Sequence, residues 1–159
     1  MSLYPPPRDI ETSVFTTVPD AFLDPERRSD WIDANKPGQK VPSFLEGPSF
    51  DRSGGLFVTD IPHGRVFRVS NKGDWSLVAD YDGWPNGLRF HKDGWVLIAD
   101  YKNGIMELDP VSGRVSGFLT HIHSEAFKGV NDLIFDSMGQ LYFTDQGQSG
   151  MHDPTGRVF

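Results

Sequence analysis

Three segments of the chain share one order of polar and apolar positions. Each segment opens with a polar residue, has a phenylalanine four residues later, and passes through a glycine-containing turn into a short apolar run that ends in aspartate. The segments read EGPSFDRSGGLFVTD at residues 46–60, NGLRFHKDGWVLIAD at 86–100 and NDLIFDSMGQLYFTD at 131–145. They align without a gap, so an internal repeat dominates the sequence.

The repeat predicts β-strands. In each unit the residues on the two sides of the turn form a β-hairpin. A third and a fourth strand follow in the first two units, at 65–69 and 75–79 and at 104–108 and 114–119. Four antiparallel strands in about 40 to 45 residues is the size of a β-propeller blade. Residues 41–159 sustain no 3.6-residue apolar period, so we expect an all-β fold.

Residues 1–40 differ from the repeats and form an N-terminal leader. The stretch 19–34 has early acidic residues and an aromatic spacing that favour one or two short helical turns, which Lys-Pro-Gly at 36–38 ends. Residues 14–18 are a candidate strand that closes the ring. We expect the leader to pack on the propeller.

The chain carries too few blades to close a ring. Residues 41–159 hold two full blades and a third that breaks off at 156–159, which repeats the start of a third strand at 64–67. A propeller closes with at least four blades, and an open flank exposes apolar side chains. We expect that exposure around Leu56, Phe57, Leu141 and Phe143. The missing blades come from a complementary polypeptide or a second copy, unless the sequence is a fragment.

Composition excludes several classes of function. The 15 Lys+Arg against 22 Asp+Glu give a net charge of −7, so we expect neither nucleic acid nor a membrane surface as partner. The absence of cysteine excludes disulfides and thiolate chemistry. The apolar run 95–99 is far shorter than the roughly 18 residues of a membrane span. Residues 1–8 lack a signal-peptide pattern, so we expect a cytoplasmic protein.

Candidate chemistry lies at one repeated position. Glu46, Asn86 and Asn131 each open an inner strand, and the inner strands of a propeller line its central channel. Their oxygen donors, without His or Cys, suit a hard cation such as Ca²⁺. The alternative is that such residues cap backbone groups before a turn. An acid that faces the axis is otherwise hard to satisfy, which favours a functional role for Glu46.

Three motifs on these strands follow one another in a fixed order and spacing. They are EGP with FD at 46–51, PNGL at 85–88, and VND with FDxxG at 130–139. In this order they resemble the SMP-30/gluconolactonase/LRE-like family of six-bladed β-propeller lactonases. The resemblance covers about residues 41–159 and implies that the chain supplies the N-terminal half of such a fold, about three blades.

The resemblance also implies one divalent cation at the channel mouth, Ca²⁺ or Zn²⁺, held by a Glu from the first blade and by an Asn and an Asp from later blades. Glu46 matches the first ligand. Asn131 and Asp132 match the place where the family positions substrate or a metal-bound water. The later Asn and the Asp that acts as general acid/base fall beyond Phe159.

The sequence departs from animal gluconolactonases at two positions. Gly129 stands where those relatives have an Arg, and Ser149 stands where counting reaches a substrate-contacting Glu. These differences argue against an aldonolactone substrate but leave lactone chemistry in place. Lys128 is a candidate channel-lining residue that neutralises an anionic substrate, or it is simply solvated. The pair His121 and His123 is assigned to the surface or the channel rim, because no third metal ligand lies nearby.

We therefore expect a metal-dependent lactonase, in which the metal polarises the lactone carbonyl and a carboxylate activates water. One alternative is a non-catalytic propeller that binds a partner, because the same fold hosts both kinds of function. Another alternative is a propeller hydrolase that acts on a phosphotriester or aryl ester. No nucleotide-binding glycine motif and no G-x-S-x-G nucleophile elbow is present.

Overall fold

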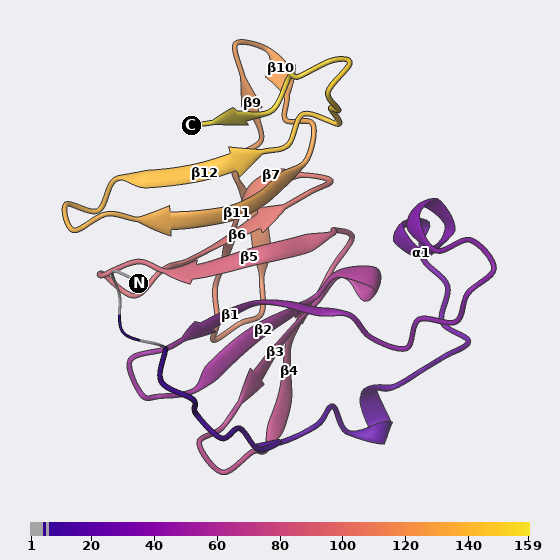
Figure 1. The fold of residues 1–159 in the computed structure, drawn as a ribbon, viewed down its shortest axis with the longest axis vertical. Helices are drawn as coiled ribbons and strands as arrows, with labels where there is room; N and C mark the ends of the chain where they lie inside the picture. Colours follow the sequence, from indigo (N-terminus) through magenta and orange to yellow (C-terminus); the bar gives the residue numbers. More distant parts are fainter. Residues whose placement is uncertain (1–4, 6) are drawn as a thin grey trace.

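Antiparallel sheets stacked one on another form most of the molecule (Figure 1). The computed structural model describes residue 5 and residues 7–159. The prediction that no signal peptide is present rests partly on residues 1–4 and 6, which lie outside the described residues. In the part of the chain that is described, no helix has the length and hydropathy to cross a membrane.

The strands follow one another within each sheet in chain order. The first sheet, blade 1, consists of β1 (Leu45–Phe50), β2 (Leu56–Asp60), β3 (Arg65–Val69) and β4 (Trp75–Asp80). Blade 2 consists of β5 (Pro85–Phe90), β6 (Val96–Asp100), β7 (Gly104–Leu108) and β8 (Val115–Leu119). A hairpin of β9 (His121–Ile122) and β10 (Glu125–Ala126) precedes blade 3, which consists of β11 (Val130–Phe135), β12 (Leu141–Asp145) and β13 (Arg157–Val158). The expected all-β blades are confirmed.

In the hairpin turns of blades 1 and 3 an aspartate side chain accepts hydrogen bonds from backbone N–H groups of the turn. Oδ1 of Asp51 accepts hydrogen bonds from the backbone N–H groups of Ser53 at 2.7 Å and Gly55 at 2.8 Å. Oδ1 of Asp136 accepts in the same way from two backbone N–H groups of its own turn. Asp favours turns because its carboxylate can satisfy backbone donors a few residues on. The glycine-containing repeat thus encodes the turn that joins the first two strands.

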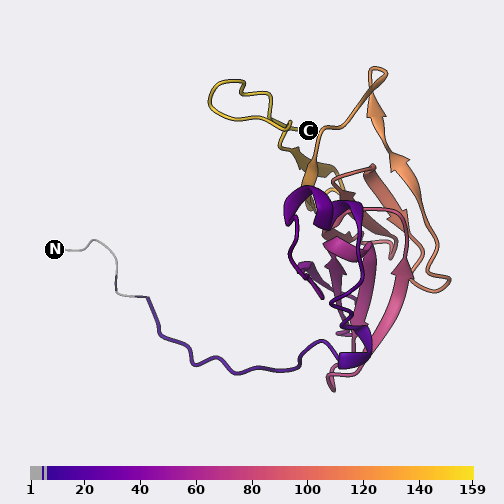
Figure 2. The same ribbon diagram turned by 90° about the vertical axis from the view of Figure 1, so that its right-hand side faces the viewer.

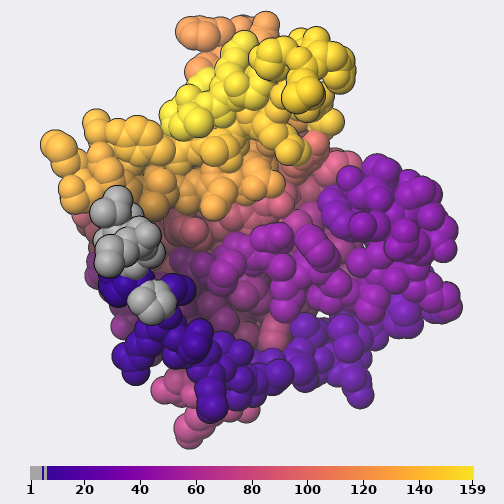
Figure 3. Space-filling model, viewed as in Figure 1, coloured from indigo at the N-terminus to yellow at the C-terminus, as the bar shows by residue number. Residues whose placement is uncertain are grey.

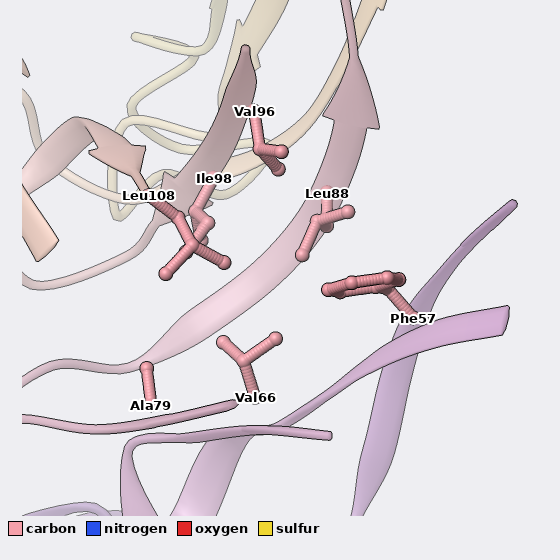
Figure 4. Packing of buried hydrophobic residues seen from close by; sticks show 7 residues of the cluster. All are labelled: Phe57, Val66, Ala79, Leu88, Val96, Ile98 and Leu108. Atoms are coloured by element: carbon pink, nitrogen blue, oxygen red, sulfur yellow. The ribbon is translucent and has the colours of Figure 1, made fainter. Parts of the chain in front are cut away.

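Two apolar cores lie between neighbouring blades. In the first core, side chains of blade 1 meet side chains of blade 2 (Figure 4); its members are Phe57, Val66, Ala79, Leu88, Val96, Ile98 and Leu108. In the second core, blade 2 meets blade 3 through Leu97, Ala99, Ile105, Val130, Leu133 and Phe143. Successive residues of β6 contribute to opposite cores because side chains alternate along a strand. Blade 2 is therefore covered on both faces.

The expected exposure at the flanks is wrong for two residues. Phe57 and Phe143 are only 2% and 5% exposed, because both side chains point toward blade 2. On blade 3 the alternate residues Ile134, Tyr142 and Val158 are exposed instead. On blade 1 Val58 is also buried, and Leu56 and Leu141 are half-buried. Figure 3 shows blade 3 in gold and yellow at the outer end of the stack.

The leader lies away from the sheets at its start, meets them at their lower end and then rises to α1 (Figure 2). Where it meets them, it covers part of the other flank of blade 1. It holds a 3-10 turn, η1 (Asp20–Phe22), and the short helix α1 (Asp30–Asn35), whose N-cap Ser29 accepts from the Ile32 N–H. The ring centroids of Phe22 and Phe67 are 4.9 Å apart.

The candidate ring-closing strand at 14–18 belongs to no sheet. Its contacts with blade 1 run through a side chain, not through a backbone ladder. The Thr16 hydroxyl donates to the Gly73 carbonyl at 3.1 Å and accepts from the indole N–H of Trp75 at 3.1 Å.

Candidate functional site

Each inner strand contains a β-bulge near its start. The pairing of β1 with β2 shifts between Glu46 and Ser49. The pairings of β5 with β6 and of β11 with β12 shift at the equivalent places. A bulge bends its strand and re-aims the side chains beside it. The three bulges occur where the repeat places Glu46, Asn86 and Asn131.

At these bulges the inner strands approach one another closely. A Cβ at Gly47 would collide with the carbonyl of Asn86 and lie 2.9 Å from the nitrogen of Leu88. A Cβ at Gly87 would lie 2.9 Å from Cα of Asp132. Only glycine permits such contact between backbones. Glycine at the second position of the first two units therefore allows three inner strands, one from each blade, to come together.

One small hollow collects the polar residues at this convergence. Its volume is about 90 Å³, and it is lined by Glu46, Gly47, Pro48, Asn86, Gly87, Arg89, Asn131 and Asp132. The structure thus brings together four of the five residues expected to form the site. Glu46, Asn131 and Asp132 are exposed, and Asn86 is half-buried.

Asn86 is held at both its backbone and its side chain. Its carbonyl accepts a hydrogen bond of 2.7 Å from the Thr59 hydroxyl of blade 1. Its side-chain amide donates to the Trp84 carbonyl at 3.2 Å. This bond uses one of the two amide N–H donors, and within the described residues the amide oxygen accepts no hydrogen bond, so Asn86 can offer that oxygen to a ligand.

Asp132 is oriented by its own strand pair. Its backbone N–H donates to the Thr144 hydroxyl at 3.2 Å, and its Oδ1 accepts from the Leu133 N–H at 2.8 Å. The Arg89 guanidinium lies beside it, with Nη2 3.7 Å from Oδ1. The repeat gives no signal for Arg89, because the equivalent residues of the other two units, Ser49 and Ile134, are not basic.

Lys128 lies outside this hollow. Its backbone N–H donates to Oδ2 of Asp145 at 2.9 Å, and it lines a separate hollow beside β10. His121 and His123 are exposed on the β9–β10 hairpin, and His123 has a left-handed φ of 50° in the turn. The two histidines therefore do not share one strand face.

The repeated aspartates that end β2, β6 and β12 are structural. Asp60 accepts from the Phe44 N–H at 2.8 Å and Asp100 from the Trp84 N–H at 3.1 Å, just as Asp145 accepts from Lys128. Each carboxylate thus holds the backbone just before the inner strand of its own blade. Buried carboxylates need such donors. These bonds position the inner strands and, with them, the hollow.

Asp100 is fully buried. Burial raises its pKa, while the Tyr81 hydroxyl at 2.7 Å and three backbone N–H groups oppose the rise. The same contact and burial raise the pKa of Tyr81 well above its usual value. The pair is a support of the inner strand and lies outside the hollow.

The donors of the hollow fit a hard cation in kind. Carboxylate oxygens of Glu46 and Asp132 and amide oxygens of Asn86 and Asn131 are ligands that Ca²⁺ accepts. Among the residues that the structure describes, no three His, Cys, Asp or Glu side chains gather as a metal site. This chain can therefore offer part of a coordination shell, in which amides supplement the carboxylates.

Comparison with known proteins agrees with this geometry. The sequence pattern of the SMP-30/Gluconolactonase/LRE-like region matches residues 44–159, which include all three blades. The chain belongs to this family. The family predicted from the three motifs is thereby confirmed.

Curated relatives in the family are bacterial lactonases. The chain is 31% identical over 137 residues to lactonase drp35 of Staphylococcus aureus strain MRSA252, an alignment that covers 81% of the chain and 40% of that protein. It is 27% identical over 140 residues to lactonase drp35 of Staphylococcus epidermidis, which covers 84% of the chain and 41% of that protein. The chain thus spans about two fifths of the relatives that it matches.

Solved structures with the same fold confirm that the chain forms part of a β-propeller. A gluconolactonase from Xanthomonas campestris matches with a TM-score of 0.63 and 20% identity, over 73% of this chain and 43% of that one. Virginiamycin B lyase from Staphylococcus aureus matches with a TM-score of 0.57 and 14% identity, over 74% of this chain and 41% of that one. At these identities the likeness shows the fold alone, and one fold hosts different reactions.

Proposed function

We propose that this family member takes part in the hydrolysis of a lactone and that the hollow between its inner strands forms one side of the active site. The convergence of Glu46, Asn86, Asn131 and Asp132 from three blades is the observation that carries the proposal. The lactonases among the relatives supply the reaction class. A small-molecule lactone is accordingly the proposed substrate.

We further propose that the hollow holds one divalent cation, with Ca²⁺ favoured by the oxygen donors and Zn²⁺ as the alternative. Such an ion, when bound, supplies a Lewis acid for the lactone carbonyl and lowers the pKa of water. Glu46 would hold the ion from β1, and the amide oxygen of Asn86 would face it from β5. The general acid/base is proposed to be an Asp outside residues 1–159.

Asn131 and Asp132 are proposed to orient the substrate or the attacking water. Their bulge directs adjacent side chains to the same hollow, whereas an ordinary strand would send them to opposite faces. The Leu133 and Thr144 contacts hold Asp132 in place. Orientation of this kind lowers the entropic part of the barrier without a new bond.

The remaining blades are proposed to come from further polypeptide, which is a continuation of this chain if the sequence is a fragment, and otherwise a complementary chain or a second copy. The free flank of blade 3 supports this proposal. It has an apolar hollow of about 240 Å³ lined in part by Leu133, Ile134, Tyr142 and Val158. Apolar surface of this kind gains free energy when it is covered.

The test is the substitution Glu46→Gln in the full protein, assayed with γ-butyrolactone as substrate. We expect metal affinity and lactone hydrolysis to fall about tenfold or more, because even partners outside the ligand shell are worth about 10–100-fold in affinity or activity. Glu107→Gln, an exposed site on β7, is the matched control and should leave both unchanged.

Full metal occupancy in Glu46→Gln by elemental analysis would contradict the metal assignment. An aryl ester and a phosphotriester, assayed in parallel, test the alternative hydrolase reading. Hydrolysis of either one without lactone hydrolysis would replace the proposed substrate class. Binding of a protein partner with no hydrolysis of any of the three would favour the non-catalytic alternative.

A further inference from the structure

Arg89 occupies a junction of all three blades. It extends from β5, and its Nη1 donates to the carbonyls of Leu88 at 2.7 Å and of Pro48, on β1, at 3.4 Å. On the third side its Nη2 faces Asp132 of β11. The guanidinium lines both the hollow of the candidate site and the apolar hollow on the flank of blade 3. It is thus fixed between the two.

Part of this guanidinium remains available to a ligand. Within the described residues, its hydrogen bonds to protein acceptors come from Nη1 alone. Nη2 stands 3.7 Å from Oδ1 of Asp132, beyond hydrogen-bond distance, and that oxygen already accepts from the Leu133 N–H. The Arg89 side chain is 31% exposed and the Asp132 side chain 57% exposed. The edge formed by Nε and Nη2 therefore makes no hydrogen bond to a protein acceptor within the described residues, on a side chain that solvent reaches.

We infer that Arg89 binds the carboxylate that forms when a lactone ring opens, and that it holds the hydroxy acid product in the hollow. The inference rests on the proposed lactone hydrolysis. Hydrolysis adds one water, breaks the ring C–O bond, and leaves a carboxylate, a hydroxyl group and a released proton. A guanidinium fork matches the planar carboxylate through parallel N–H donors.

The surroundings favour this role for Arg89 over a purely structural one. The Nη1 contacts hold the stem and one edge of the fork, and they leave Nε and Nη2 for the ligand. Arg89 is the one cationic side chain among the residues that line the hollow within the described chain. Apart from the proposed cation, a product carboxylate in the hollow would without Arg89 face only the like charges of Glu46 and Asp132.

The experiment measures binding of 4-hydroxybutanoate, the hydroxy acid of γ-butyrolactone, to the full protein by calorimetry and by NMR of the arginine Nε–H signals. Arg89→Gln keeps an amide N–H for the backbone carbonyls but removes the charge and the fork. We expect it to weaken binding about tenfold or more, since the variant loses both the charge and the parallel donors that strengthen a hydrogen bond to a carboxylate. Arg52→Gln removes the same charge from the exposed β1–β2 turn and should bind like the wild type.

Several outcomes overturn the inference. It fails if the wild type does not bind 4-hydroxybutanoate, if folded Arg89→Gln binds it equally well, or if inorganic phosphate binds through Arg89 while the carboxylate does not. If Arg89→Gln does not fold, Arg89→Lys serves instead, because it keeps the charge and loses the fork. It should then bind more weakly than the wild type, and equal binding overturns the inference.

The binding assay also separates this inference from the proposed function. Carboxylate binding that depends on Arg89 without lactone hydrolysis supports the anion site and rejects the activity. Lactone hydrolysis with carboxylate binding that is independent of Arg89 rejects the anion site and keeps the activity.

Discussion

Single buried polar residues hold the inner strands of this partial propeller in place. Asp100 is fully buried, and its two oxygens accept hydrogen bonds from Tyr81, Trp84, Lys102 and Asn103. An unpaired buried donor costs roughly 1–3 kcal/mol. The stability of the site therefore depends on residues that do not line it.

Asp100→Asn tests this dependence. The new amide N–H group would face either the Trp84 N–H, beside a Tyr81 hydroxyl that could turn to accept, or the two N–H donors of the turn. In both orientations at least one backbone donor would lose its acceptor. We expect a loss of about 1–3 kcal/mol in the free energy of unfolding, measured by urea denaturation. Asp153→Asn at an exposed site should change this energy little. Equal stability of the two variants would show that the buried bonds contribute nothing net.

The buried side chain of His63 should make the stability of the protein depend on pH. Burial lowers its pKa below 6.5, and Asp60 and the Val41 carbonyl only partly oppose this effect. On acidification His63 therefore binds a proton in the unfolded chain at a higher pH than in the native state. The stability that neutral His63 provides is complete above pH 6.5 and is lost as the pH falls toward the lowered folded value.

The free energy of unfolding, measured by urea denaturation between pH 7.5 and 5.5, shows whether stability falls on acidification. We expect His63 to contribute a slope of at most about 1.4 kcal/mol per pH unit. His63→Gln should flatten the profile, while His152→Gln, at an exposed site, should not. A wild-type profile that does not fall on acidification would show that the pKa of His63 is not lowered in the native state.

At the scale of elements, the bulged inner strands form the hollow because they can approach one another at glycine. Gly47 has a φ of +56° and lies against the backbone of β5, whereas Gly54 has a φ of +83° and faces open space. Alanine at either position bears the strain of a left-handed backbone. Only at Gly47 does it also force two strands apart.

We therefore expect Gly47→Ala to be clearly more destabilising than Gly54→Ala, by about 1–3 kcal/mol, which is the range for overpacked sites. Gly47→Ala should also disturb the site more, since it displaces Glu46 from Asn86. Urea unfolding and metal titration of the two variants measure these effects. If both variants lose the same stability, backbone strain alone accounts for Gly47, and the close approach is unimportant.

At the scale of the whole molecule, the stack has two different ends. The leader covers part of the flank of blade 1, where Phe22 packs on Phe67. The flank of blade 3 has no such cover within the described chain, and Ile134 and Val158 are 60% and 74% exposed there. Association through this flank would gain roughly 25 cal/mol of free energy for each Å² of apolar surface that it buries.

We expect residues 1–159 expressed alone to self-associate or to bind a chain that carries further blades. Ile134→Arg should weaken that association, because it places a charge in the buried contact. Val111→Arg, at a position 94% exposed on another surface, is the control. Sedimentation equilibrium measures both. A compact monomer of the wild-type segment with a cooperative unfolding transition would contradict the need for further blades.

Short sequence patterns were enough to predict most strands of the fold. The repeat, its short apolar runs and its glycine-containing turns predicted every strand of blades 1 and 2, since strand pairing within a blade joins neighbours in the sequence. The repeat also placed Glu46, Asn86 and Asn131 at equivalent positions, and the structure brings them to one hollow. The short β9–β10 hairpin was missed, because two-residue strands leave no period to detect.

Tertiary structure decided which face each strand buries and which residues join the hollow. Phe57 and Phe143 are buried because their blades stack on blade 2, and a pattern of alternation does not say which of two faces will be covered. Arg89 enters the hollow although its repeat equivalents are not basic, and Lys128 stays outside although it lies close in sequence to Asn131. Sequence determines a residue's position along its strand. Its neighbours across the blades follow from packing between strands that are distant in the chain.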